Sequence, residues 1–247
     1  MHPLHPLHPL HPKKIVALDL DGTITQHRSE LEEQNRAVLE ALSRRYRLLI
    51  VGAGLCMRIW KQLRRFPIDI IGCYGMQLAL YNAETGTLEL KRSERLPCDR
   101  ASVLKRVDIL RERFGYTCYT GDSADFHESG AVTIALLGTK ADIGDKLAFD
   151  PTREKRRPIY PFVVELFPEY NVFVGGSSSF DMTPKPYDKY YALDCFCREE
   201  GCSHEDIVFI GDDYGEGGND EPVYRSDFDF IAVDDYRELG KAAELLL

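Results

Sequence analysis

Short apolar runs alternate with segments of helical periodicity along most of the chain. Four runs have the length of a strand and cover residues 15–18, 47–51, 68–71 and 207–210. Residues 56–63 carry apolar side chains at the i, i+3, i+4 and i+7 spacing of a helix. A run without polar alternation is typical of a strand buried on both faces, and strands joined through helices form parallel sheets. The pattern predicts an α/β fold with a doubly wound, mainly parallel Rossmann-like sheet.

A helix is expected directly after the first run. Ser29 and Glu32 have the spacing of a capping box, and Leu31, Val38 and Leu42 continue at helical spacing. The prediction is a helix of about sixteen residues that returns the chain across the sheet.

The alternation is interrupted from about residue 76. Two alternating segments around residues 82–86 indicate a hairpin, and a helix ending at Gly115, a strand over 131–137, a helix around 158–167 and strands flanking 175–177 follow. The strand–helix pattern then resumes with a helix over 188–199, a strand over 228–233 and a helix over 236–246. We therefore expect a catalytic core of residues 13–83 and 185–247 with an α+β cap inserted over 84–184. Residues 1–12 repeat a His-Pro-Leu unit, and such repeated proline predicts a disordered tail.

Composition and net charge limit the number of domains and the classes of binding partner. A chain of 247 residues that is 44% hydrophobic allows one large core or two smaller ones. The net charge of −9 argues against nucleic-acid or anionic-membrane partners, and a small anionic substrate would need local cations. No apolar run approaches the length of a membrane span, so a cytoplasmic protein is expected. The expected oligomeric state is a monomer or a homodimer.

Acidic residues end two of the predicted core strands. Asp19 and Asp21 follow the first run and, two positions apart, leave the same face of an extended chain. Their repulsion is relieved by a divalent cation or by protonation of one carboxyl group. Asp212 and Asp220 follow the run at 207–210, and parallel strands present their carboxyl ends at one rim. Lys189, at the start of the helix predicted over 188–199, would supply a cation for a phosphoryl group on Asp19.

Three segments together resemble a known superfamily. They are D-L-D-G-T at 19–23, P-Y-D-K at 186–189, and G-D-D with G-G-N-D within 211–220. In order and type they resemble three of the four motifs of the haloacid dehalogenase-like (HAD) superfamily. Within it the chain is similar, over most of residues 14–236, to eukaryotic-type phosphomannomutases and their bacterial phosphatase relatives, which carry an inserted C2-type cap. The spacing between G-D and N-D is longer than is usual there.

The resemblance implies roles for individual residues. It makes Asp19 the nucleophile and Asp21 the acid/base. It implies one Mg²⁺ ion, held by Asp19, the backbone carbonyl of Asp21, Asp212 and, as support, Asp220. The phosphate would be bound by Gly22, Thr23, Ala53, Gly54, Lys189 and Asn219. In the cap, Ser179 and Asp181 would contact the sugar.

Two departures from the family pattern affect the predicted activity. The second motif usually carries a Ser or Thr hydroxyl, whereas the matching turn here is Gly52-Ala53-Gly54. Gly54 either leaves room for a side chain or is needed for a positive φ. The resemblance also implies cap arginines that grip a second phosphate in the mutase, but residues 126–130 read F-H-E-S-G and contain no arginine. The charged run at 153–157 either substitutes for those arginines or is a solvated face.

These observations favour a Mg²⁺-dependent phosphatase that hydrolyses a phosphorylated sugar or similar small metabolite through an aspartyl phosphate. A hexose-phosphate mutase is the first alternative. A protein that binds a phosphorylated ligand without turnover is the second.

Overall fold

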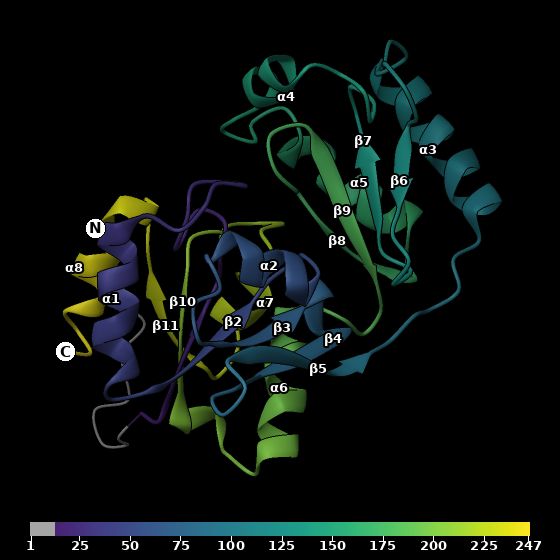
Figure 1. Ribbon diagram of the computed structural model, residues 1–247. Helices are drawn as coiled ribbons and strands as arrows, with labels where there is room; N and C mark the ends of the chain where they lie inside the picture. The colour runs from purple at the N-terminus through teal and green to yellow at the C-terminus, as the bar shows by residue number, and fades with distance from the viewer. Residues whose placement is uncertain (1–12) are drawn as a thin grey trace. The chain divides into compact units, whose positions relative to one another are not determined.

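The computed structural model describes residues 13–247, and the predicted tail at 1–12 lies outside them. The chain forms two compact units, each with its own sheet (Figure 1). Unit 1 comprises the described residues up to Glu94 together with Lys189–Gly215 and Asp220–Leu247. Unit 2 comprises Arg95–Asp188 and Glu216–Asn219.

Unit 1 is built on a seven-stranded sheet in the order β11-β10-β1-β2-β3-β4-β5. Its strands are β1 (Ile15–Leu18), β2 (Arg47–Val51), β3 (Asp69–Gly72), β4 (Gln77–Asn82), β5 (Thr87–Ser93), β10 (Ile207–Gly211) and β11 (Asp229–Ala232). Its helices are α1 (Glu33–Ser43), α2 (Cys56–Gln62), α6 (Lys189–Glu200), α7 (Glu221–Tyr224) and α8 (Leu239–Ala243), with 3₁₀ turns at Cys73–Gly75, His204–Asp206 and Tyr236–Glu238. The pairs from β11 to β3 are parallel, whereas β4 and β5 pair antiparallel. The predicted fold class is confirmed.

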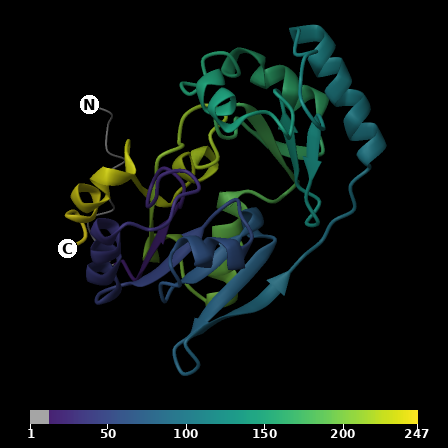
Figure 2. The same ribbon diagram turned by 45° about the horizontal axis from the view of Figure 1, so that its top comes forward.

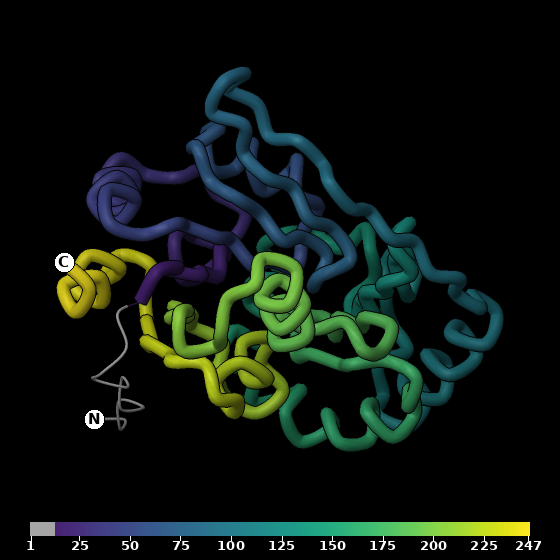
Figure 3. The backbone as a smooth tube through the Cα atoms, turned by 90° about the horizontal axis from the view of Figure 1, so that it is seen from below, coloured from purple at the N-terminus to yellow at the C-terminus, as the bar shows by residue number. Residues whose placement is uncertain are grey.

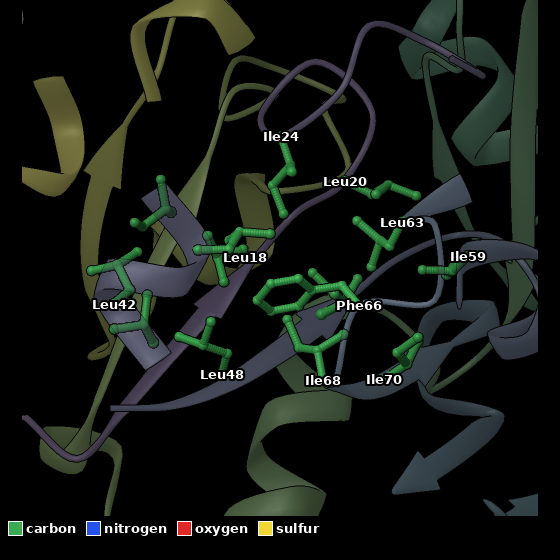
Figure 4. Close-up of a cluster of buried hydrophobic side chains, with 14 of the residues drawn as sticks. Leu18, Leu20, Ile24, Leu42, Leu48, Ile59, Leu63, Phe66, Ile68 and Ile70 are labelled. Atoms are coloured by element: carbon green, nitrogen blue, oxygen red, sulfur yellow. The ribbon is translucent and has the colours of Figure 1, made fainter. Parts of the chain in front are cut away.

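Both faces of this sheet are buried, as the uninterrupted apolar runs require. Leu18, Leu48 and Ile70 pack on one face with side chains from α1, α2 and the loop after α2 (Figure 4). Ala17 and Phe209 pack on the other face with side chains of α6. Figure 3 shows α6 as the green helix in front of the sheet. The strands are thereby fixed in position, and the residues that follow their carboxyl ends are placed by the core.

Two expectations for unit 1 differ from the structure. Helix α1 has 11 residues rather than about sixteen, and its N-cap is Glu32, whose side chain makes no capping hydrogen bond. Ser29 instead closes a turn by donating its N–H to the Gln26 carbonyl, so the expected capping box is wrong.

The β4–β5 hairpin extends the sheet of unit 1 beyond β3 (Figure 2). Residues 84–94 therefore belong to unit 1, although the predicted boundary placed them in the insert.

Unit 2 contains a four-stranded antiparallel sheet in the order β6-β7-β9-β8. Its strands are β6 (Ala124–Phe126), β7 (Val132–Ala135), β8 (Tyr170–Phe173) and β9 (Ser179–Pro184). Its helices are α3 (Arg100–Phe114), α4 (Ile143–Phe149) and α5 (Tyr160–Leu166), with a 3₁₀ turn at Arg157–Ile159. Apolar side chains of α3 and α5 pack on one face of the sheet. No helix among residues 13–247 has the length and hydrophobicity needed to cross a bilayer.

Arg156 is fully buried in unit 2, so the solvated-face reading of the run at 153–157 is wrong for this residue. Its guanidinium forms an ion pair of 2.9 Å with Asp150 and also donates to the Asp150 carbonyl. The remaining hydrogen bonds go to the carbonyls of Gly175, Gly176 and Ser179. All five N–H groups of the guanidinium are thus used, and they tie the turn between β8 and β9 to Asp150.

Candidate functional site

The site begins where β1 ends. Strand register places Leu18 opposite Ile210 of β10 and Ile50 of β2, so the carboxyl ends of the three parallel strands lie at one edge. The N–H of Asp19 continues the ladder by donating to the Ile210 carbonyl at 2.9 Å. The Asp19 side chain is buried at this edge. The rim predicted from the acidic residues after two apolar runs is therefore present.

Lys189 lies between two of the carboxylates. Its Nζ is 2.5 Å from Asp19 Oδ1 and 2.6 Å from Asp220 Oδ1, and its side chain is fully buried. Burial acts to lower the pKa of the ammonium, but the two carboxylates more than offset this and raise its pKa. Lys189 is therefore a charged group that holds Asp19 and Asp220 close together.

Asp19, Asp212 and Asp220 form an acidic cluster. Each offers an oxygen within 4.8 Å of the others, and among residues 13–247 this is the one such group of three acidic, histidine or cysteine side chains. Burial, with repulsion from neighbouring carboxylates, raises the pKa of Asp19 to about 7, of Asp220 to about 7 and of Asp212 to about 6. Three carboxylates, two of them buried, leave excess negative charge beside one ammonium, and hard oxygen donors suit Mg²⁺. The cluster fits the predicted metal.

Groups around the cluster orient its oxygens. The Thr23 hydroxyl donates to Asp212 Oδ1 at 2.8 Å, and the Asp213 N–H donates to Asp220 Oδ2 at 2.9 Å. Thr23 was predicted to bind phosphate, and the structure gives its hydroxyl a carboxylate as partner. Gly22 has φ of 104°, and a Cβ there would overlap the Asp212 carboxylate. Only glycine fits this turn, because any side chain would push away a predicted metal ligand.

The Asp21 carboxylate is held separately from the three-acid cluster. Its Oδ1 accepts the Arg28 N–H at 2.9 Å and the Gln62 carboxamide at 2.7 Å. Gln62 also donates to the Thr25 hydroxyl at 3.0 Å and accepts from Arg58 Nη1 at 2.9 Å. Two donors on one oxygen fix the direction of the carboxylate, which suits a group that exchanges protons.

The turn at the end of β2 differs from both alternatives given for Gly54. Ala53 is exposed and Gly54 half-buried, and the Gly54 carbonyl accepts the Cys73 N–H at 2.9 Å. Gly54 is not one of the residues with a positive φ. The Arg58 guanidinium instead occupies the position where a side chain at residue 54 would begin.

The remaining predicted residues lie in unit 2. Ser179 and Asp181 are on β9, where Asp181 Oδ1 accepts the Thr133 hydroxyl at 2.9 Å and the Ser179 hydroxyl donates to the Gly175 carbonyl at 3.0 Å. Asn219 belongs to the segment 216–219, in which the Gly217 carbonyl accepts the Val174 N–H at 2.8 Å. The structure thus brings Asp19, Asp212, Asp220 and Lys189 together, and it describes Ser179, Asp181 and Asn219 within the other unit.

Gln62 and Arg58 are site residues that the sequence analysis missed. Gln62 is buried although it is polar, and it lies three positions after Ile59 and one before Leu63, beside the apolar stripe of α2. A polar side chain at the edge of a buried stripe was the available signal. Arg58 gave none, because an exposed arginine on a helix is ordinary.

Comparison with known proteins agrees with the fold. A family model for eukaryotic phosphomannomutase matches residues 121–233. Among solved structures, the IMP-bound IMP-nucleotidase of Plasmodium falciparum superimposes with a TM-score of 0.69 at 14% identity, covering 96% of this chain and 69% of that one. A HAD-superfamily phosphatase from Bacteroides thetaiotaomicron gives 0.59 at 16% identity, covering 97% and 96%. The chain thus has the same fold as these proteins, and one of them belongs to the superfamily that its three motifs resemble.

Its relatives in sequence are phosphomannomutases. The phosphomannomutase of Encephalitozoon cuniculi is 25% identical in an alignment of length 255, gaps included, which covers 93% of each chain. The predicted similarity to this family is confirmed, and the proteins that this chain resembles include both mutases and phosphatases.

Proposed function

We propose that this protein is a Mg²⁺-dependent phosphatase that hydrolyses a phosphorylated sugar or a similar small metabolite in the cytoplasm. The observation that carries the proposal is the placement of Lys189 between Asp19 and Asp220, with Asp212 in the same cluster. In this arrangement the Asp19 carboxylate can attack a phosphorus atom while the Lys189 ammonium is held beside it. The separate Asp21 carboxylate, held by Gln62, supplies the proton exchange.

The reaction has two steps. An oxygen of Asp19 attacks phosphorus, the bond from phosphorus to the ester oxygen breaks, and Asp21 gives its proton to the leaving alcohol. A water molecule then attacks phosphorus and passes a proton to Asp21, and the bond from phosphorus to the Asp19 oxygen breaks to release phosphate. Bound by Asp19, Asp212 and Asp220, Mg²⁺ would offset negative charge on the transferring phosphoryl group.

A hexose-phosphate mutase is the second candidate, because the sequence relatives are named phosphomannomutases. In a mutase a sugar hydroxyl, rather than water, takes the phosphoryl group, so the second phosphate needs cations of its own. The buried Arg156 has no N–H group left for such a phosphate. The sequence F-H-E-S-G at 126–130 also lacks arginine. Both observations favour the phosphatase.

The test is phosphate release from a panel of hexose phosphates, trehalose phosphate and a nucleoside monophosphate in the presence of Mg²⁺. Each reaction is also analysed for an isomerised product, with and without a hexose bisphosphate activator. The proposal expects stoichiometric alcohol and phosphate without isomerisation. Isomerisation that depends on the bisphosphate would identify a mutase, and ligand binding without either product would identify a binding protein.

Asp19→Asn is the matched control for this panel. The amide keeps the shape of the side chain but does not attack phosphorus, so turnover should fall by several orders of magnitude while the thermal unfolding curve stays cooperative. Turnover within tenfold of the parent enzyme would remove Asp19 as the nucleophile.

A further inference from the structure

The side-chain cation within the acidic cluster, Lys189, is engaged by carboxylates. The chain carries a net charge of −9, and the cluster itself contains three carboxylates. Lys189 is already shared between Asp19 and Asp220. A phosphate monoester approaching this rim therefore needs a further positive group, since the usual hydroxyl of the second motif is also missing.

Arg58 lies at the position of that missing side chain. Gly54 follows β2, whose last residues pair with β3 on one side and with β1 on the other. Neighbouring strands are about 4.8 Å apart, so the turn after β2 lies next to the turn that carries Asp19 and Asp21. A Cβ built on Gly54 would lie 2.7 Å from Arg58 Cζ and from Nε, which shows that the guanidinium fills the space of a residue-54 side chain.

The guanidinium is also connected to the acid/base. Arg58 Nη1 donates to Gln62 Oε1 at 2.9 Å, and the other end of the same carboxamide donates to Asp21 Oδ1 at 2.7 Å. Arg58 is exposed, and no carboxylate of residues 13–247 forms an ion pair with it. Its charge is thus held at the rim by a neutral partner and is not neutralised.

We propose that Arg58 binds the oxygens of the substrate phosphate and replaces the hydroxyl of the second motif, with Gly54 present to make room for the guanidinium. The planar guanidinium has parallel N–H donors that match two phosphate oxygens. Gln62 orients it and at the same time orients Asp21, so one side chain aligns the phosphate-binding and proton-transfer groups. This inference rests on the proposed phosphatase function, because it names a further group that touches the substrate.

The experiment compares Arg58→Ala and Arg58→Lys with Lys61→Ala as the matched control. Lys61 is an exposed lysine in the last turn of the same helix, so its removal changes the charge of α2 by the same amount. The readouts are KM for an aryl phosphate and the inhibition constant of inorganic phosphate. Arg58→Ala should raise both by about ten- to a hundredfold, because a hydrogen bond to a charged group is lost. Arg58→Lys should give intermediate values of KM and of the inhibition constant. For Lys61→Ala both values should stay within twofold of those of the parent.

A double-mutant cycle tests the role of Gly54. Gly54→Ser alone should displace the guanidinium and weaken phosphate binding, whereas in the Arg58→Ala background the same serine should be neutral or restore binding. Equal losses in both backgrounds would overturn the proposed exchange of hydroxyl for guanidinium. An Arg58→Ala variant with unchanged KM and phosphate inhibition would overturn the binding role itself.

Binding of inorganic phosphate and of orthovanadate is measured by the shift in melting temperature. This measurement distinguishes a failure of the Arg58 site from a failure of the proposed phosphatase function. A parent protein that hydrolyses no ester but is stabilised by phosphate in an Arg58-dependent manner would refute the phosphatase and keep the anion site. A protein that hydrolyses esters with no dependence on Arg58 would refute only the site. If Arg58 acted solely through Gln62 on Asp21, its replacement would change the pH profile of kcat and leave phosphate inhibition unaltered, which also counts against the proposal.

Discussion

The carboxamide nitrogen of Gln62 donates a 2.7 Å hydrogen bond to Asp21 Oδ1. This contact joins the helix after β2 to the turn after β1, and the Arg28 N–H reinforces it at 2.9 Å. The Asp21 carboxylate therefore has a fixed direction although it lies in a loop. Proton transfer depends on that direction, since a general acid must be within hydrogen-bond reach of the leaving oxygen.

Gln62→Leu should lower kcat by roughly ten- to a hundredfold, the effect of losing one hydrogen bond to a charged group in the transition state. Gln62→Glu places a second carboxyl group beside Asp21, so the pH profile of kcat should move to higher pH. The measurements are steady-state kinetics with an aryl phosphate from pH 5 to 9. A pH profile that is the same for parent and Gln62→Glu would show that Asp21 is not the acid/base.

Asp212→Asn should raise the Mg²⁺ concentration needed for half-maximal activity by at least tenfold, because one charged ligand of the cluster is replaced by a neutral amide. Chelation of the metal should abolish turnover in the parent and be reversed by added Mg²⁺. Mg²⁺ should also raise the melting temperature of the parent more than that of Asp212→Asn. Asp213→Asn is the neighbouring control. Parent activity that survives chelation would contradict the predicted cofactor.

Asp181→Ala should raise KM for sugar phosphates much more than KM for a small aryl phosphate. A lost hydrogen bond to a sugar hydroxyl costs about 0.5–1.5 kcal/mol, or roughly two- to tenfold in affinity. Thr133→Val is the control, because it removes the hydroxyl that donates to Asp181 at 2.9 Å and leaves the carboxylate in place. Equal effects of Asp181→Ala on both substrates would show that this residue does not contact the sugar.

Asp206 should make stability depend on pH. The ammonium of Lys14, with the N–H and hydroxyl of Ser203, lowers the pKa of Asp206 from 3.8 to about 2. A lowered pKa in the folded state means that the stabilisation is complete above pH 4 and is lost as the pH falls toward 2. Because Lys14 is largely exposed, the free energy of unfolding should change by about 1 kcal/mol through this group.

Denaturant unfolding of the parent and of Asp206→Asn measures this effect. At pH 7 the variant should be less stable than the parent, and the difference should shrink between pH 4 and pH 2. A difference that stays constant over this range would contradict the assigned cause.

The sequence alone determined the parallel sheet and the rim that carries Asp19, Asp212 and Asp220. Both follow from local rules, since an uninterrupted apolar run predicts a buried strand and parallel strands end at the same edge. The position of Lys189 at the first residue of α6 was likewise visible, because the strand–helix alternation resumes there.

The boundaries of α1 and the position of the hairpin were not determined in this way. The start of α1 depends on the turn that Ser29 closes, which competes with the expected cap. The hairpin pairs with β3 through backbone hydrogen bonds, and its own sequence gives no sign of which sheet it joins.

Only the tertiary structure placed Gln62 and Arg58 beside Asp21 and Gly54. Forty-one positions separate Gln62 from Asp21 along the chain, and the contact exists because β1 and β2 are neighbours in one sheet. Apolar periodicity specifies which face of α2 is buried, but a polar contact depends on the exact direction of individual side chains. That direction is set by packing between segments distant in sequence, and so the chemistry at the end of β2 could not be inferred from the Gly-Ala-Gly turn by itself.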